Sequence, residues 1–264
     1  MVRVPCFHID AFASTRFTGN PAAVVVFASY PPDAVLQAIA AEHNLSETAF
    51  LVQDGAKWHL RWFTPTVEVP LCGHATLASA WVILERIAPD RDDVVFITLR
   101  SGELRVCRTG SAYEMDFPSL PPVPVAPPPG LAAMLGVEPI EVLANATNYL
   151  AVLESAAVVR GLTPDLQAIA RLDRSGLIVS ARGDHEYDCV SRYFAPQKGI
   201  PEDPVTGGAH CALAPYWAAR LGKPELRAFQ ASRRGGVIGC RVDGDRVALR
   251  GKCIVFSEGH LELD

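Results

Sequence analysis

The sequence lacks an apolar run long enough to cross a membrane. The longest apolar stretch near its N-terminus, residues 22–28, has the length of a strand, whereas a membrane-spanning helix needs about 20 apolar residues. Arg3, His8 and Asp10 interrupt the apolar residues before that stretch, so no signal peptide fits. We therefore expect a cytoplasmic protein with no role at a membrane.

An excess of basic residues is also absent. Lys and Arg together number 24 against 29 Asp and Glu, and the formal net charge is -5. A general nucleic-acid binder needs a basic face that replaces the counterions of the phosphates. The charge balance therefore argues against nucleic acid as a partner and favours small molecules.

The chain lacks the cysteine patterns of a disulfide framework or a zinc cluster. Its seven cysteines are odd in number, widely scattered, and include no pair separated by two residues. We therefore expect free thiols, and only Cys72 lies in a setting that suggests chemistry. Most of the others are expected to act as small buried side chains; the others are Cys6, Cys107, Cys189, Cys211, Cys240 and Cys253.

Disordered and low-complexity segments are missing as well. The 264 residues are 49% hydrophobic and 20% charged, which is typical of a compact protein with a large core. The length allows one large domain or two of about 130 residues.

An internal repeat favours two domains: residues 36–40 recur letter for letter as residues 166–170. Three further landmarks recur in the same order, namely Asn20 and Asn148 before a strand, residues 63–65 and 194–196 before a glycine turn, and hairpins bracketed by Gly102 and Gly110 or by Gly236 and Gly244.

A proline-rich segment separates the two predicted halves. Residues 119–130 contain six prolines, which forbid helix, discourage sheet and stiffen a linker. The predicted halves are residues 1–118 and residues 131–264, and the last strand is left free to pair with the N-terminal half. A linker that holds two halves at a set distance makes the cleft between them the expected ligand site.

Both halves follow the order strand, helix, strands, helix, hairpin. Asp33 is expected to cap a helix that ends near Asn44, and Thr163 to cap its counterpart. Residues 94–106 and 113–117 alternate like half-buried antiparallel strands. The predicted class is α+β, with two pseudo-symmetric halves.

Each half also contains a glycine turn that opens an alanine-rich helix, at residues 70–76 and 203–210. Glycine lets backbone N–H groups approach a ligand, and a helix start carries partial positive charge. The turns at Gly73 and Gly207 could therefore cradle the carboxylate of a small substrate. Taken alone, such turns serve packing equally well.

Polar residues that lack a counterpart in the other half indicate where chemistry has been added. Glu47, His74 and Asp203 are the three such residues. A carboxylate in an apolar strand is costly to bury, and its desolvation raises the pKa toward the range of a general acid or base. The residue type leaves open that Glu47 lies in a solvated loop.

Together these motifs resemble the phenazine biosynthesis PhzF-like family over nearly the entire chain. The matching segments are residues 10–12 (DAF), 17–22 (FTGNPA), 46–50 (SETAF), 61–65 (RWFTP), 72–76 (CGHAT) and 202–207 (EDPVTG). The resemblance implies a diaminopimelate epimerase-like fold, in which each half is a barrel-like, mostly antiparallel sheet around a central helix. It also implies a cofactor-independent isomerase with no metal, nucleotide or flavin, which forms a homodimer.

The resemblance implies a role for each matching residue. Glu47 falls on the family's proton shuttle, and His74 and Asp203 fall on residues that hold or polarise a small anionic substrate. Gly73 and Gly207 would receive its carboxylate. One departure is Gly208, which stands where the family often has serine, so the pocket loses a hydroxyl donor and acceptor.

Related epimerases place a cysteine in each glycine turn, and here those places are Cys72 and Thr206. A threonine hydroxyl cannot accept a proton as a thiolate does, which disfavours a symmetric two-base reaction. Two alternatives stay open: an epimerase or dehydratase of an amino or hydroxy acid with Cys72 as base, and a protein that binds a small ligand without catalysis.

Overall fold

The computed structural model describes residues 2–263 and divides into two compact units. The first comprises residues 1–116 and 250–264, and the second comprises residues 117–249. Two strands carry the chain from one unit to the other, β8 (Ala112–Pro118) and β16 (Arg246–Gly251). Each unit is described by itself.

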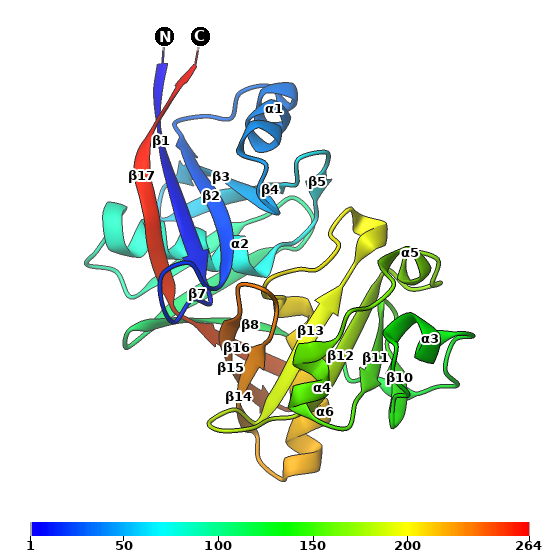
Figure 1. Cartoon of the computed structure of the whole chain (residues 1–264). Helices are drawn as coiled ribbons and strands as arrows, with labels where there is room; N and C mark the ends of the chain where they lie inside the picture. The colour runs from blue at the N-terminus through cyan, green and yellow to red at the C-terminus, as the bar shows by residue number, and fades with distance from the viewer. Residues whose placement is uncertain (1, 264) are drawn as a thin grey trace. The chain divides into compact units, whose positions relative to one another are not determined.

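The first unit is a mostly antiparallel sheet (Figure 1). Its strands are β1 (Val2–Ala11), β2 (Asn20–Phe27), β3 (Glu47–Asp54), β4 (Lys57–Phe63), β5 (Glu68–Val69), β6 (Asp93–Ile97), β7 (Glu103–Thr109) and β17 (Cys253–Leu263). Strand β2 runs parallel to β3, and β4 runs parallel to β6. The pairs β1–β2, β3–β4 and β6–β7 are antiparallel.

Helix α2 (Gly73–Val82) forms the centre of the first unit. Every residue from His74 to Val82 is buried, and the helix packs against β1, β2, β3 and β17. A helix that is apolar on all sides is stable only when it is enclosed. It continues as a π-helical turn, η1 (Ile83–Ile87). Helix α1 (Asp33–His43) packs by Leu36 and Ile39 on a separate apolar cluster with Val25 and Phe50.

Strand β17 completes the sheet of the first unit. It pairs with β1 antiparallel, from Val2 opposite Leu263 to Ala11 opposite Cys253, with one bulge after His8. The two strands lie side by side in Figure 1, although they come from opposite ends of the sequence. The last strand thus belongs with residues 1–116 rather than with the rest of the C-terminal half.

The second unit repeats the same series of strand directions. Its strands are β9 (Val123–Pro124), β10 (Glu141–Ala144), β11 (Asn148–Val152), β12 (Gly176–Arg182), β13 (Cys189–Phe194), β14 (Glu225–Gln230) and β15 (Gly236–Asp243). The pairs β11–β12 and β13–β14 are parallel, and β10–β11, β12–β13 and β14–β15 are antiparallel. The predicted α+β class is confirmed.

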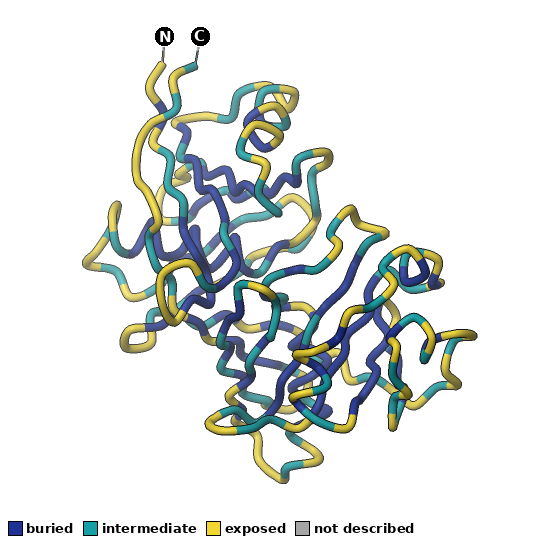
Figure 2. The backbone as a smooth tube through the Cα atoms, in the orientation of Figure 1, coloured by how far each residue is buried: buried dark blue, intermediate teal, exposed yellow. Residues whose placement is uncertain are grey.

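Helix α6 (Gly207–Leu221) is the long, largely buried helix of the second unit and packs on β14 and β15. The other helices are short: α3 (Leu131–Leu135), α4 (Ala156–Gly161), α5 (Leu166–Ile169) and η2 (Pro196–Lys198). Buried segments occupy the interior of each unit in Figure 2. Among residues 2–263 there is no helix with the length and hydropathy of a membrane span.

Two predicted helix caps differ from the structure. Asp33 is the first residue of α1 rather than its cap, which is Pro32, and its carboxylate accepts a hydrogen bond from Arg61 at 2.8 Å. The helix predicted after Thr163 starts at Leu166, where Asp165 is the cap and accepts from the Ala168 N–H at 3.0 Å.

The proline-rich segment contributes to a sheet instead of being only a spacer. Its strand β9 pairs with β10, and the Val125 N–H donates to the Val142 carbonyl at 3.1 Å. Proline lacks the N–H that a central strand needs, but an edge position tolerates it. Residues 117–130 are accordingly part of the second unit.

Candidate active site

Glu47 is the first residue of β3, and its carboxyl group is buried. Its side chain is 11% exposed, and the residue lies opposite Ala22 in the parallel pair β2–β3. The apolar run that follows, from Ala49 to Leu51, is fully buried and holds the start of the strand against the core. Glu47 is therefore not a residue of a solvated loop.

His74 and Cys72 surround the carboxyl group of Glu47. Cys72 is the N-cap of α2 and His74 lies in the first turn. The Nε2 atom of His74 is 3.4 Å from Glu47 Oε2, and its Nδ1 atom is 3.4 Å from Cys72 Sγ. One ligand-type atom from each of the three residues lies within 4.8 Å of the other two, and all three residues are buried.

A closed ring of hydrogen bonds orients the His74 imidazole. The Ser46 hydroxyl donates to Asn20 Oδ1 at 3.2 Å, the Asn20 amide lies 3.1 Å from His74 Nδ1, and His74 Nε2 lies 3.4 Å from Ser46 Oγ. With the Asn20 amide as donor to Nδ1, the ring proton must be on Nε2. This tautomer directs an N–H toward Ser46 and Glu47.

Burial keeps His74 neutral. Desolvation lowers the pKa of His74 to about 3, and a hydrogen bond with the Pro21 backbone acts in the opposite direction. The 3.4 Å contact with Glu47 is thus a contact of a neutral imidazole with a carboxyl group rather than an ion pair at neutral pH.

The start of α2 presents backbone donors next to these side chains. The first N–H groups of an α-helix have no partner within the helix, and they carry partial positive charge. In α2 the Cys72 carbonyl accepts from both the N–H and the hydroxyl of Thr76, at 3.1 and 2.6 Å, which fixes the first turn. The N–H groups of Gly73, His74 and Ala75 precede this hydrogen bond and are the donors that the start of α2 would offer to an anion.

The second unit has its own polar cluster at the start of α6. The Thr206 hydroxyl donates to Asp203 Oδ2 at 2.5 Å, and Gln230 Nε2 donates to the Asp203 carbonyl at 2.7 Å and to Thr206 Oγ1 at 3.1 Å. The Thr206 N–H donates to Gln230 Oε1 at 2.9 Å. Asp203 is 8% exposed, so the cluster is rigid and largely buried.

Gly207 and Gly208 follow Thr206 as the first residues of α6. A Cβ atom added at Gly208 would meet no atom within 4 Å, so the absence of a side chain there is not required by packing. His210 is fully buried and turns into the unit, where Nδ1 donates to the Thr206 carbonyl at 2.8 Å. It does not replace a hydroxyl at position 208.

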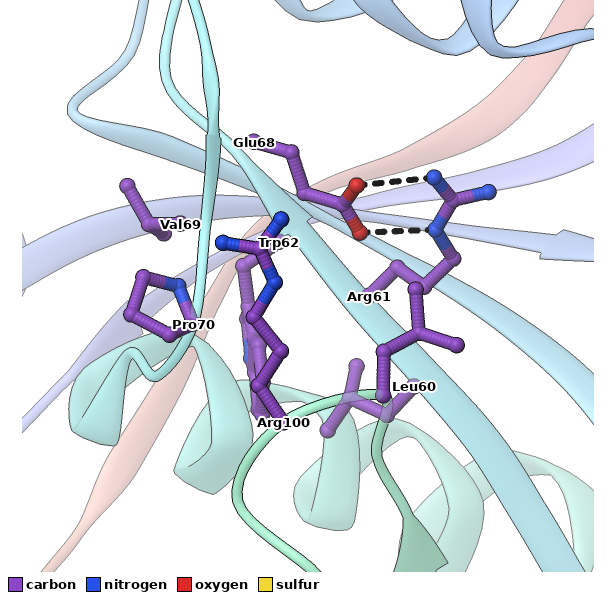
Figure 3. A pocket seen from close by; sticks show the side chains of 8 residues that line it. Leu60, Arg61, Trp62, Glu68, Val69, Pro70 and Arg100 are labelled. Carbon is purple, nitrogen blue, oxygen red and sulfur yellow. Dashed lines mark hydrogen bonds and ion pairs between the residues drawn. The ribbon is translucent and has the colours of Figure 1, made fainter.

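A separate pocket lies on β4 and β5 and contains none of the predicted site residues (Figure 3). Arg61 in this pocket donates two hydrogen bonds to Glu68, at 2.7 and 2.8 Å, and a third to Asp33 at 2.8 Å. Its charge is therefore balanced within the protein. We assign this pocket a structural role.

The structure brings together two groups of the residues that the sequence singled out. Glu47, Cys72, Gly73 and His74 are neighbours in the first unit, and Asp203, Thr206, Gly207 and Gly208 are neighbours in the second. The site contacts of Ser46, Gln230 and Asn20 were not predicted from the sequence, in which Ser46 and Asn20 were only parts of motifs. Asn20 could have been predicted as a site residue, because it is a polar residue at the start of a buried strand. Gln230 lies in no recognisable motif, so the sequence does not indicate its role.

Comparison with solved structures identifies the type of fold. A probable proline racemase from Agrobacterium radiobacter superposes with a TM-score of 0.62 over 99% of this chain and 93% of that chain, at 11% identity. The crystal structure of a PhzF-family protein from Enterococcus faecalis superposes with a TM-score of 0.96 at 42% identity, over 99% of this chain and 100% of that one. The fold is the epimerase-like fold that the sequence predicts.

The chain belongs to the phenazine biosynthesis-like family, whose model matches residues 9–259. A relative from Pseudomonas aeruginosa, described as an uncharacterized isomerase, is 48% identical over 97% of this chain and 98% of its own. The predicted enzyme class, a PhzF-like isomerase, is confirmed.

Proposed function

We propose that the protein is a cofactor-independent isomerase in which Glu47 moves a proton within a small, carboxylate-bearing substrate. The observation that carries the proposal is the buried Glu47 carboxyl group, 3.4 Å from a neutral His74 and next to the start of α2. A base in such a setting is shielded from water and faces fixed donors.

The proposed reaction conserves protons and electrons. The Glu47 carboxylate takes a proton from a carbon atom beside an electron-withdrawing group, and a carbon–carbon double bond shifts along the substrate. The resulting carboxylic acid returns the same proton to another carbon atom, so one C–H bond breaks and one forms. The N–H groups of Gly73, His74 and Ala75 would stabilise the negative charge that develops.

Substrate-binding groups are proposed for each unit by itself. In the first unit the proposed contacts are His74, Cys72 and the Gly73 N–H. In the second they are Asp203, Thr206 and the N–H groups of Gly207 and Gly208. The hydrogen bond from the Thr206 hydroxyl holds the Asp203 carboxylate in one orientation. A carboxylate that is already oriented can accept a hydrogen bond from a substrate at little further entropic cost, which supports a binding role for Asp203.

One observation favours the alternative with Cys72 as base: its thiol lies at the start of α2, where a thiolate would be stabilised. A two-base epimerase would need a second acid or base, and the residue that corresponds to Cys72 in the other glycine turn is Thr206. Its hydroxyl already donates to Asp203 and accepts from Gln230. The single-base reaction of Glu47 is therefore preferred.

The test is conversion of a substrate to its isomer, followed by ¹H NMR, on a panel of small cyclic and unsaturated carboxylic acids. Glu47→Gln keeps the shape and removes the base, so turnover should fall by about 10²–10⁴. Glu42→Gln makes the same change at an exposed residue of α1 and should have no effect.

Two results would contradict the proposal. Turnover that survives Glu47→Gln and disappears in Cys72→Ala would identify Cys72 as the base. Thermal stabilisation by a panel member, with no product formed by the wild type, would indicate a binding protein.

A further inference from the structure

The Glu47, Cys72 and His74 side chains have the composition of a metal site. Among residues 2–263 they are the only group of three ligand-type side chains close enough to hold one ion. They supply a carboxylate oxygen, a thiol sulfur and an imidazole nitrogen, which is a donor set suited to Zn²⁺ and similar thiophilic ions. The group is built from the end of a strand and the first turn of a helix, both rigid elements.

The distances in this group approach those of a tetrahedral site. Bond lengths of about 2.3 Å to sulfur and 2.0–2.2 Å to nitrogen or oxygen place neighbouring ligand atoms roughly 3.4–3.6 Å apart. His74 Nε2 is 3.4 Å from Glu47 Oε2 and 4.0 Å from Cys72 Sγ. Cys72 Sγ lies nearer to His74 Nδ1, at 3.4 Å, than to Nε2. Binding of one ion through Nε2 therefore requires a rotation of the Cys72 side chain in addition to shifts of a few tenths of an ångström.

We propose that Glu47, Cys72 and His74 bind a thiophilic divalent cation such as Zn²⁺, with water as the fourth ligand. Three bonds form, from the metal to Oε of Glu47, Sγ of Cys72 and Nε2 of His74. The Cys72 thiol releases its proton to solvent. No atom changes oxidation state.

The surrounding hydrogen bonds can adapt to the ion. When the metal takes the place of the Nε2 proton, the neutral imidazole carries its proton on Nδ1 instead. A turn of the Asn20 amide then presents Oδ1 to Nδ1–H and Nδ2 to the Ser46 hydroxyl, so all members of the ring remain paired. Such outer partners fix the orientation of metal-binding histidines.

The consequence for the enzyme is inhibition. A cation on the Glu47 carboxylate blocks the group that must accept the substrate proton, so metal and turnover exclude each other. Inhibition rests on the proposed function, whereas binding of the ion does not. The family resemblance implies an enzyme that needs no cofactor. The proposed ion agrees with this, because it inhibits the enzyme and is not required for activity.

The experiment uses the reduced full chain, titrated with ZnCl₂ by calorimetry and with CdCl₂ by the ultraviolet absorbance of the Cd–thiolate bond. One ion per chain and a thiolate absorbance are expected. Cys72→Ser should abolish the absorbance and weaken Zn²⁺ binding by more than the roughly 10–100-fold that outer-partner changes cost. Glu47→Gln should weaken binding and keep the absorbance.

Cys6→Ser is the matched control. The Cys6 thiol also lies near a histidine, 3.7 Å from His43 Nε2, but belongs to no three-residue group, so its loss should leave binding unchanged. Wild-type-like binding by Cys72→Ser, or no thiolate absorbance in the wild type, would overturn the inference. If metal binding fails while Glu47→Gln still abolishes turnover, only the metal site is wrong; the reverse pattern contradicts only the proposed function.

Discussion

The hydroxyl of Thr206 donates a 2.5 Å hydrogen bond to the carboxylate of Asp203, three residues earlier in the chain. The same oxygen accepts from Gln230 at 3.1 Å. Both hydrogen-bonding roles of this hydroxyl are thus used inside the second unit. Thr206 therefore positions Asp203, and its only hydroxyl proton is directed to Asp203 rather than to a substrate.

Thr206→Val should destabilise the protein. The change removes a hydrogen bond to a charged, buried carboxylate, and such bonds contribute about 1.5–3 kcal/mol. Thr206→Ser keeps the hydroxyl and should lose much less. Urea denaturation of the three proteins measures the difference, and equal free energies of unfolding for Val and Ser would show that the hydroxyl does not support the cluster.

Asn20→Asp should reverse the His74 tautomer. In the wild type the amide of Asn20 donates to Nδ1, so ¹⁵N NMR should show an unprotonated Nδ1 and a protonated Nε2. A carboxylate at position 20 can only accept, which favours a proton on Nδ1. Turnover should fall because the N–H toward Glu47 is lost. A wild-type spectrum with a protonated Nδ1 would contradict the described ring.

Gly208→Ser should be tolerated and should change ligand preference. A side chain there meets no atom within 4 Å, and serine suits a helix better than glycine by up to about 0.5 kcal/mol. The added hydroxyl should alter KM for carboxylates more than kcat. Gly222→Ser is the control, because Gly222 has φ of +66° and serine there should cost about 1 kcal/mol. Equal losses of stability at both positions would contradict the open space at 208.

His210 should make stability depend on pH. Burial lowers the pKa of His210 to about 4 from its usual 6.5, against the opposing effect of its hydrogen bond to Thr206. Between these values the unfolded chain binds a proton that the folded protein does not, so the free energy of unfolding falls as pH decreases from about 6.5 to 4. The loss is on the order of 3 kcal/mol.

The test of this pH dependence is urea denaturation at pH 7.5 and pH 4.5 for the wild type and for His210→Asn. Asparagine can keep the donor to the Thr206 carbonyl and does not titrate. Its stability should therefore decrease less over this range, whatever its value at pH 7.5. The same decrease in both proteins would exclude His210 as the cause.

Much of the fold follows from local patterns. The alternation in residues 94–106 and 113–117 corresponds to β6, β7 and β8, because period-two burial is intrinsic to half-buried strands. Helix starts were harder to place. Thr163 and Asp165 are both good N-cap residues, they flank a proline, and the sequence alone does not choose between them; the structure uses Asp165.

The candidate site was predictable only in part. Glu47, Cys72 and His74 stand out because their residue types carry chemistry in an otherwise apolar setting. The burial of Glu47 was not predictable, since residue type allows either a loop or a strand. Gln230 reaches Thr206 from β14, which is 24 residues later in the chain. Partners of this kind depend on tertiary structure and leave no local signal.

The pairing of β1 with β17 has a consequence for biosynthesis. During translation, residues 117–249 have all been made before β1 receives its second neighbour. The second unit can therefore mature on the ribosome while the first still presents an unsatisfied edge of backbone N–H and C=O groups, which is a hazard for association with other nascent chains. The unit that contains Glu47 is started first and finished last.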